Sequence, residues 1–246
     1  EALYLANICR HVTVVHRRER FRAEARHAAL VNHEGIASVY DFGEEEGSAY
    51  LVMELVPGEA LSTILERERY LSPERVLDIV AQTASALHAA HEAGLVHRDV
   101  KPANIMVDLP SGLVKVMDFG VARVADAART RTGVVLGTPT FMSPEQLAGQ
   151  NIDGRSDIYS LGVTLFQLLT GQLPYPNDSM AVLMRAIAKD PVPDLCAIRP
   201  DLPRALGDVV ALALQKHPQT RYPTGHDMAT DLLAVHRSMQ PIDIPL

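Results

Sequence analysis

The sequence predicts an α+β protein in which a small strand-bearing N-terminal part precedes a large, mainly helical C-terminal part. Residues 36–42 and 49–54 have the short apolar runs of strands, joined by the turn-forming "GEEEGS". Pro57 and Gly58 in "VPGEAL" then break this pattern, as a hinge would. Beyond them, apolar residues recur at helical spacing through most of the chain.

Local signals set the elements in order. In "LSPERVLDIVAQTASALHAAHEAG", Ser72 can cap a helix, Pro73 suits its first turn and Gly94 suits its exit. "SDIYSLGVTLFQLLTG" is apolar on nearly all sides, which predicts a central buried helix. Other expected elements are a helix over about 20–31, strands over 105–107 and 113–116, and helices over 180–189, 205–215 and 226–237. The predicted parts are 1–54 (N-terminal, partial), 55–58 (hinge), 59–238 (helical) and 239–246 (tail).

The composition disfavours some classes of function. The chain has 246 residues and a net charge of −7, whereas nucleic-acid-binding surfaces usually need a basic stripe. Cys9 and Cys196 have no metal-ligand spacing and fit a reduced setting. No apolar run reaches the roughly 18 residues of a membrane span, so no membrane contact is expected within this chain. Because residue 1 is Glu, we expect a piece of a longer protein, either cytoplasmic throughout or the cytosolic domain of a membrane-anchored one.

One loop concentrates the residues that carry chemistry. "LVHRDVKPANIMV" holds Asp99, Lys101 and Asn104 between short apolar runs, and Asp118 follows in "VMDFGVA". The amide of Asn104 and the carboxylate of Asp118 are oxygen donors of the kind that Mg²⁺ prefers. Asp99 is then the residue to accept a proton, and Lys101 the one to steady a developing negative charge. These are the parts that phosphoryl transfer requires, since that reaction depends mostly on positioning and charge stabilisation.

Four motifs in this chain resemble those of a known family. "HRDVKPANI", "DFGVAR", "GTPTFMSPEQ" and "DGRSDIYSLGVTLFQLLTG" are similar in order and spacing to protein kinases, above all the eukaryotic-like serine/threonine kinases of bacteria. The resemblance covers about residues 21–237 and implies a bilobal protein-kinase-like fold. Its N-lobe would be small and β-rich, complete or cut short, and its C-lobe large and mainly helical. A small-molecule kinase is disfavoured because "GTPTFMSPEQ" resembles a peptide-seating segment.

The resemblance implies an activity and roles for the catalytic residues. The activity is ATP-dependent transfer of the γ-phosphoryl group to Ser or Thr hydroxyls of protein substrates. Asp99 would orient and deprotonate the substrate hydroxyl, while Asn104 and Asp118 would hold Mg²⁺, with Mn²⁺ as an alternative. Lys101 would touch the transferring phosphate, as in serine/threonine rather than tyrosine kinases. Thr138 would hydrogen-bond Asp99 and Lys101 and help to seat the acceptor.

The resemblance also implies a nucleotide site in the N-lobe and hinge. "LVMELV" is similar to the adenine-binding hinge, with Met53 as gatekeeper. Glu54 and Val56 would offer backbone hydrogen bonds, and Met106 would lie under the base. Glu24 would be the helix glutamate that holds the phosphate-gripping lysine of the family.

Structural roles are implied in the same way. Glu145 of "SPE" would pair with Arg221, and breaking such a buried pair is strongly destabilising. Asp157 would brace the backbone of the catalytic loop from the central helix. His97 and Phe119 are likewise expected to have structural roles.

The segment between Asp118 and Glu145 is expected to regulate activity. Thr130 and Thr132 match paired phosphorylation sites of the bacterial family, and Arg98 would be a cation for a phosphothreonine to neutralise. Autophosphorylation between two molecules would require self-association. The alternative is that these are ordinary loop threonines, flanked by Arg129 and Arg131 for solubility.

One part of the kinase machinery is absent from the sequence. The first lysine is Lys101, and no G-x-G-x-x-G precedes Glu24. "VTVVH" resembles the start of the strand that carries the phosphate-gripping lysine, with Val15 or a neighbour in its place. Either that part of the N-lobe is missing from the string, or the protein is a degenerate pseudokinase that serves as an ATP-binding interaction module. Retention of the catalytic aspartate and both metal ligands favours an authentic kinase.

Two histidines raise a weaker alternative. His88 and His91 have a spacing that can bind zinc on a helix, but no third ligand stands near them in the sequence. We therefore expect both to be plain histidines of the helix surface.

Overall fold

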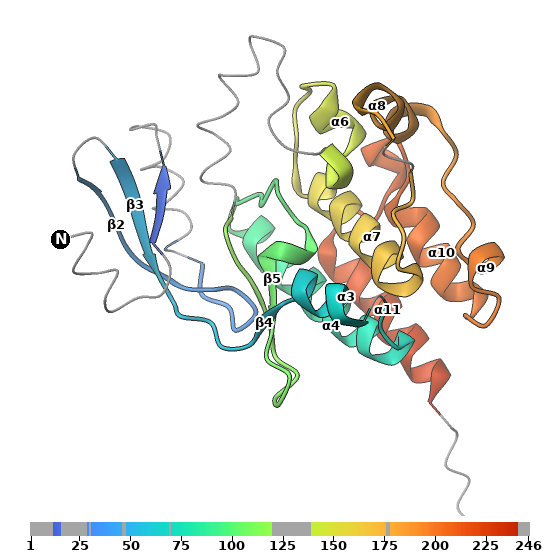
Figure 1. Ribbon diagram of the computed structural model, residues 1–246, viewed down its shortest axis with the longest axis horizontal. Helices are drawn as coiled ribbons and strands as arrows, with labels where there is room; N and C mark the ends of the chain where they lie inside the picture. The colour runs from blue at the N-terminus through green and yellow to red at the C-terminus, as the bar shows by residue number, and fades with distance from the viewer. Residues whose placement is uncertain are drawn as a thin grey trace, which may run out of the picture.

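The computed structural model describes residues 12–15, 29, 31–45, 48–68, 70–119, 139–175 and 178–240. Figure 1 shows a small sheet on the N-terminal side, a second small sheet in the middle, and helices that make up the rest. This arrangement confirms the predicted α+β fold with a β-rich N-lobe and a mainly helical C-lobe. None of the described helices combines the length and the apolar character needed to cross a lipid bilayer.

The N-lobe sheet contains antiparallel strands in the order β1-β3-β2. They are β1 (Val12–Val15), β2 (Val39–Glu45) and β3 (Ser48–Met53). The hairpin predicted within residues 36–54 is present, but the predicted edges of its strands and turn are wrong. β2 begins only at Val39 because Ile36 bridges instead to Val116 in the second sheet, where the nitrogen of Ala37 donates to the Val116 carbonyl at 3.0 Å.

β1 contains the "VTVV" that resembles the start of the lysine strand. It pairs with β3, from Val12 opposite Val52 to Val15 opposite Ala49. The helix expected over about 20–31 lies outside the described residues except near its end, where Ala29 is helical.

A second sheet, in the order β4-β5-β6, follows the hinge. Its strands are β4 (Glu59–Ala60), β5 (Ile105–Val107) and β6 (Val114–Val116). The strand predicted over 105–107 is confirmed, whereas Leu113 belongs to the turn, where its carbonyl accepts from the nitrogen of Asp108 at 2.9 Å. Gly58 has φ +101°, and a Cβ there would overlap the carbonyl of Val107. Glycine therefore lets the hinge run close against β5.

The helices of the C-lobe surround one hydrophobic core. They are α3 (Leu61–Glu68), α4 (Pro73–Glu92), α6 (Pro144–Leu147), α7 (Gly154–Thr170), α8 (Met180–Lys189), α9 (Leu195–Ile198), α10 (Arg204–Ala213) and α11 (Gly225–Met239). Short 3-10 turns are η1 (Pro102–Asn104), η3 (Pro139–Phe141) and η4 (Pro218–Thr220). As predicted, Ser72 caps α4 by accepting a hydrogen bond from the nitrogen of Arg75. α7 is buried along nearly its whole length, which confirms the predicted central helix, and α4, α10 and α11 pack against it.

The end of α11 lies close to the predicted start of the C-terminal tail. Met239 still belongs to α11 and packs against the hydrophobic core, so the helix outlasts the expected boundary at residue 238. Residues 241–246 lie outside the described part of the chain.

Candidate active site

Asp157, in the first turn of α7, holds the loop between α4 and β5 by its backbone. Oδ2 of Asp157 accepts a hydrogen bond from the nitrogen of His97, and Oδ1 accepts one from the nitrogen of Arg98, both at 2.8 Å. Asp157 is fully buried, so these bonds compensate for removing its charge from water. The bracing contact expected of Asp157 is therefore present.

His91 contacts the same carboxylate, which the sequence did not predict. Its Nε2 lies 2.8 Å from Oδ2 of Asp157, and its side chain is 14% exposed. A Cβ on Gly154 would overlap the His91 ring, so glycine at the start of α7 makes room for the imidazole. The expectation of a plain surface histidine is wrong for His91 because α7 covers this side of α4. His88 lies elsewhere, with its ring centroid 5.6 Å from that of His226.

His97 joins the loop to the segment that carries Asp118. Its Nδ1 accepts from the nitrogen of Asp99 at 3.2 Å, and its Nε2 donates to the carbonyl of Met117 at 2.8 Å. This pattern requires the tautomer with the proton on Nε2. The ring also packs on Phe119, with 4.7 Å between the ring centroids. His97 and Phe119 thus bring the two chemistry-bearing segments together.

Asp99 lies at the centre of a polar cluster, which we call the Asp99 cluster (Asp99, Lys101 and Asn104). Nζ of Lys101 donates to Oδ2 of Asp99 at 2.8 Å. Nδ2 of Asn104 donates to the same oxygen at 3.2 Å and to the Asp99 carbonyl at 2.8 Å. The side chains of Asp99 and Lys101 are 19% and 35% exposed, so a reactant can reach them.

The two predicted metal ligands lie on neighbouring segments. The nitrogen of Met117 donates to the carbonyl of Asn104 at 2.9 Å, which holds Asp118 next to the loop. Nδ2 of Asn104 is engaged with Asp99, which leaves Oδ1 as the atom that would hold a cation. An amide oxygen and a carboxylate suit Mg²⁺, which also takes oxygens from phosphates and water. In the described part of the chain, no group of three or more His, Cys, Asp and Glu side chains is arranged to hold a metal by itself.

The backbone is strained at two positions of this site. Arg98 has φ 68° and Asp118 has φ 55°, and they are the non-glycine residues with positive φ in the described ranges. Such conformations cost on the order of 1–3 kcal/mol each and cluster at functional sites. Around Arg98 the strain is offset by the bond to Asp157 and by Gln146, whose Nε2 donates to the Arg98 carbonyl at 2.9 Å.

A cavity of about 330 Å³ opens between the hinge and β5. Met53, Glu54 and Val56 line it from the hinge, and Met106 and Asp118 line it from the C-lobe. The structure therefore brings together four residues that the resemblance assigned to the nucleotide and one, Asp118, that it assigned to the metal. Lining residues that the sequence analysis missed are Leu55, Gly58, Ala60, Ala103 and Met117. Each lies within a few residues of a predicted one, so adjacency in the chain was the available signal.

Glu54 also makes side-chain contacts that the sequence did not reveal. Its Oε1 accepts from Nζ of Lys115 on β6 at 2.6 Å, and its Oε2 accepts from the nitrogen of Ser38 at 3.1 Å. The backbone nitrogen of Glu54 donates to the Ser38 carbonyl at 2.8 Å. Of the two backbone groups of Glu54, the carbonyl is therefore the one that remains to hydrogen-bond a ligand. Burial acts to raise the pKa of Glu54, but the hydrogen bonds from Lys115 and Ser38 outweigh it and lower the pKa.

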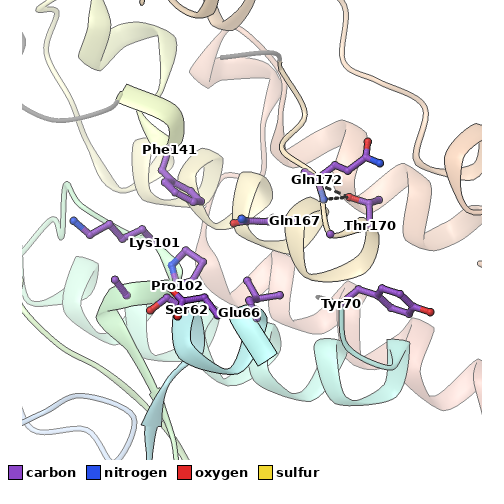
Figure 2. A pocket seen from close by; sticks show the side chains of 12 residues that line it. Ser62, Glu66, Tyr70, Lys101, Pro102, Phe141, Gln167, Thr170 and Gln172 are labelled. Carbon is purple, nitrogen blue, oxygen red and sulfur yellow. Dashed lines mark hydrogen bonds between the residues drawn. The ribbon is translucent and has the colours of Figure 1, made fainter. Parts of the chain in front are cut away.

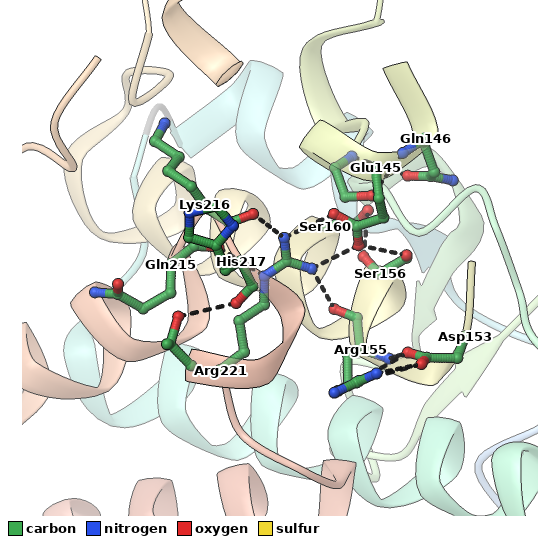
Figure 3. A network of polar contacts seen from close by, with 12 residues as sticks. Glu145, Gln146, Asp153, Arg155, Ser156, Ser160, Gln215, Lys216, His217 and Arg221 are labelled. Atoms are coloured by element: carbon green, nitrogen blue, oxygen red, sulfur yellow. Dashed lines mark hydrogen bonds and ion pairs between the residues drawn. The ribbon is translucent and has the colours of Figure 1, made fainter. Parts of the chain in front are cut away.

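Glu145 and Arg221 form the expected ion pair. Together with Ser156 they make up what we call the Glu145 cluster. Nη1 of Arg221 lies 2.6 Å from Oε1 of Glu145, and Nη2 lies 2.8 Å from Oε2 (Figure 3). Ser156 donates to Glu145 at 2.6 Å, and the other N–H groups of Arg221 donate to backbone carbonyls. Burial acts to raise the pKa of Glu145, but Arg221 and Ser156 outweigh it and lower the pKa.

Other predicted site residues lie outside the described part of the chain. They are Glu24, Thr130, Thr132 and Thr138. Their roles stay predictions, as does the regulatory role of Arg98.

Comparisons with known proteins agree with one another. The family model for the protein kinase domain matches residues 7–233. Serine/threonine-protein kinase PknA of Mycobacterium tuberculosis is 46% identical over 230 residues, which are 91% of this chain and 52% of that kinase. PknB of the same organism is 44% identical over 230 residues, which are 90% of this chain and 36% of that kinase. The chain thus spans about half or less of the curated relatives that it matches.

A solved structure shows the same fold. Rad53 1-466, in complex with AMP-PNP, matches with a TM-score of 0.77 and 24% sequence identity, over 89% of this chain and 56% of that chain. At this identity the likeness speaks for the fold alone. With the relatives above, it confirms the predicted bilobal fold and the predicted resemblance to bacterial serine/threonine kinases.

Proposed function

The chain belongs to the protein kinase domain family, and from this premise we propose that the protein transfers the γ-phosphoryl group of ATP to serine and threonine hydroxyls of proteins. The observation that carries the proposal is the Asp99 cluster, in which Lys101 and Asn104 both donate to one carboxylate oxygen. A base, an ammonium and hard oxygen ligands beside one cavity are what phosphoryl transfer requires.

We assign the proton transfer to Asp99. As the substrate oxygen bonds to the γ-phosphorus and the bond from phosphorus to the ADP oxygen breaks, the hydroxyl proton passes to the Asp99 carboxylate. The hydrogen bonds from Lys101 and Asn104 orient that carboxylate. Lys101 also brings a positive charge to the phosphoryl oxygens, and Thr138 would help to seat the acceptor hydroxyl.

We assign the divalent cation to Asn104 and Asp118. Family members use ATP with a divalent metal, and for this chain we propose Mg²⁺, with Mn²⁺ as the alternative. When bound, the cation neutralises charge on the phosphate oxygens and aligns them. The strained backbone of Asp118 supports a functional role for its carboxylate.

We assign the adenine to the cavity between the hinge and β5. The carbonyl of Glu54 and the nitrogen of Val56 would make the backbone hydrogen bonds, while Met53 and Met106 would supply apolar contact. Glu24 would face the ATP phosphates through a lysine partner that this chain does not supply before Lys101.

The absence of a lysine before Lys101 supports a second candidate function. A protein that binds ATP weakly and serves as an interaction module would also retain this fold. The observation that favours it is the sequence of β1, "VTVV", which offers no ammonium to the phosphates. The intact Asp99 cluster favours the kinase instead.

Radiolabelled ATP separates the two candidates. The kinase should label itself and a generic protein acceptor in the presence of Mg²⁺, and Asp99→Asn should abolish the label. If the gene encodes residues before Glu1, a chain that includes them is the decisive sample. Nucleotide binding without phosphate transfer by that longer chain would establish the interaction module.

We propose that activity is switched by phosphorylation of Thr130 and Thr132, with Arg98 as the cation that receives the phosphate. Phosphorylation in trans requires two molecules, so the initial rate should rise with the square of protein concentration. Mass spectrometry after incubation with ATP tests the sites. Phosphate found only on other residues would overturn the assignment.

A further inference from the structure

Two histidine rings meet where α4 packs against α11. His88 lies on α4 and His226 in the first turn of α11, and their ring planes are tilted by 41°. His88 is half-buried and His226 is exposed, so solvent reaches the pair. The sequence analysis considered His88 together with His91, but the fold directs His91 to Asp157 and brings His226 to His88 instead.

A close approach of the two helices fixes the position of this pair. A Cβ on Gly225, the residue before His226, would overlap the carbonyl of Ala84 and would lie 3.3 Å from Cβ of His88. Glycine therefore lets the start of α11 touch the backbone of α4 one turn before His88. The two rings are thus held on packed helices rather than on loops, which lowers the entropy cost of bringing them together around a ligand.

The ring nitrogens of this pair have no other task. Neither His88 nor His226 has a side-chain hydrogen bond to another described residue. By contrast, His91 and His236 each contact an aspartate, at 2.8 Å and 3.0 Å. A neutral imidazole keeps a lone pair on one ring nitrogen, so both rings can act as metal ligands. Imidazole suits Zn²⁺, Cu²⁺ and Ni²⁺, whereas Mg²⁺ takes oxygen ligands.

The spacing of the two rings suits one shared ion. Two imidazoles on a tetrahedral zinc, each with a Zn–N bond of about 2.0–2.1 Å, have ring centroids roughly 5–6 Å apart. The centroids of His88 and His226 are 5.6 Å apart. Among the described residues, no third His, Cys, Asp or Glu side chain completes a metal-binding group, so water would take the remaining positions. Such a site is open and exchangeable, unlike a closed structural zinc site.

We propose that His88 and His226 bind one transition-metal dication, represented by Zn²⁺, and that the ion links α4 to α11. Because folding alone brings the two ligands together, the bound ion stabilises the folded C-lobe. The stability of the C-lobe then depends on the availability of the metal. The inference does not depend on the proposed function, because neither histidine belongs to the Asp99 cluster or lines the cavity between the hinge and β5.

Titration calorimetry with zinc chloride measures this site. Excess Mg²⁺ in the buffer occupies oxygen ligands elsewhere and does not compete for imidazole. We expect one zinc ion per chain to depend on the pair. His88→Asn and His226→Asn should each raise the Kd of that ion by at least about tenfold, since one imidazole alone loses the advantage of chelation. The control is His217→Asn, which removes an exposed histidine of another segment and should leave the Kd unchanged.

Two further measurements identify the ligands and the effect on stability. With Cu²⁺ in place of Zn²⁺, electron paramagnetic resonance should show two imidazole nitrogens on the ion, and only one in either variant. Zinc chloride at about 100 times the Kd should raise the melting temperature of the wild type by about 5–10 °C, and by much less in His226→Asn.

An unchanged zinc affinity in His226→Asn would overturn the proposal, and so would an equal loss of affinity in His217→Asn. His226 is exposed, so this test stands even if the half-buried His88 cannot be replaced without unfolding. Circular dichroism confirms that each variant is folded. All of these measurements are made without nucleotide, so their outcome is separate from that of the phosphate-transfer assay.

Discussion

Two polar clusters of this molecule hold similar groups in opposite environments. In the Asp99 cluster, the side chains of Asp99 and Lys101 are 19% and 35% exposed. In the Glu145 cluster, the side chains of Glu145 and Arg221 are 4% and 0% exposed. The first lies beside the strained backbone of Arg98, and the second joins the segment after η4 to α6 in the interior.

The difference agrees with the role proposed for each cluster. A buried ion pair must have its hydrogen-bonding groups satisfied, because an unpaired charge in the interior is strongly destabilising. A carboxylate that accepts a proton from a substrate must instead remain within reach of that substrate. We therefore expect substitutions in the Asp99 cluster to change activity more than stability, and substitutions in the Glu145 cluster to change stability first.

The largest expected effect is on activity at Asp99. Asp99→Asn keeps the shape of the side chain but removes the proton acceptor, and a general base contributes roughly 10²–10⁴-fold to a rate. We expect kcat to fall by about that factor while the melting temperature stays the same or rises. Transfer from radiolabelled ATP and calorimetry measure the two quantities. Loss of activity through unfolding would erase the contrast between the clusters.

The next effect is on stability at Arg221. Arg221→Leu leaves the Glu145 carboxylate buried without its partner, which should lower the free energy of unfolding by about 3–5 kcal/mol. Urea denaturation followed by circular dichroism measures it. The control is Arg204→Leu, whose pair with Asp194 is exposed, with side chains 69% and 51% accessible. It should change stability little. Equal losses of unfolding free energy in the two variants would show that burial does not determine how much an ion pair contributes to stability.

The pH dependence of stability sharpens the contrast. The folded-state pKa of Glu145 is lowered, so its contribution is fully present above the usual glutamate pKa of about 4.3 and is lost as pH falls through the lowered value. The unfolding free energy of the wild type should exceed that of Glu145→Gln clearly at neutral pH and less in acid. Urea titrations across this range measure the gap. A gap that widened in acid would contradict the lowered pKa.

The smallest effect is expected at the half-buried pair between Lys115 and Glu54. Their side chains are 14% and 20% exposed, between the exposures of the two clusters. Lys115→Met should cost about 1–2 kcal/mol of stability, because the hydrogen bond is charge-assisted but partly hydrated. Lys189→Met, at an exposed position on α8, is the control and should be neutral. A loss as large as that of Arg221→Leu would mean that exposure is a poor guide here.

The sequence by itself was enough to predict the fold class, and some of its local features. Capping by Ser72 and the buried character of α7 are local properties, because each depends on residues that are close together in the chain. The pairing of Glu145 with Arg221 came from the family pattern, since nothing local relates them. Adjacent positions that line the cavity between the hinge and β5, such as Leu55 and Met117, were within reach of the same reasoning.

Contacts between distant segments were decided only by the tertiary structure. His91 looked like a surface histidine because its own helix gives no sign that Asp157, 66 residues away, packs against it. Lys115 and Glu54 are 61 residues apart and meet only because β6 lies beside the hinge. A cavity of about 730 Å³ likewise lies between α3, η1 and the end of α7 (Figure 2). Hydrophobic period and capping specify where an element begins and which face it buries, but which side chain meets that face depends on how the elements pack.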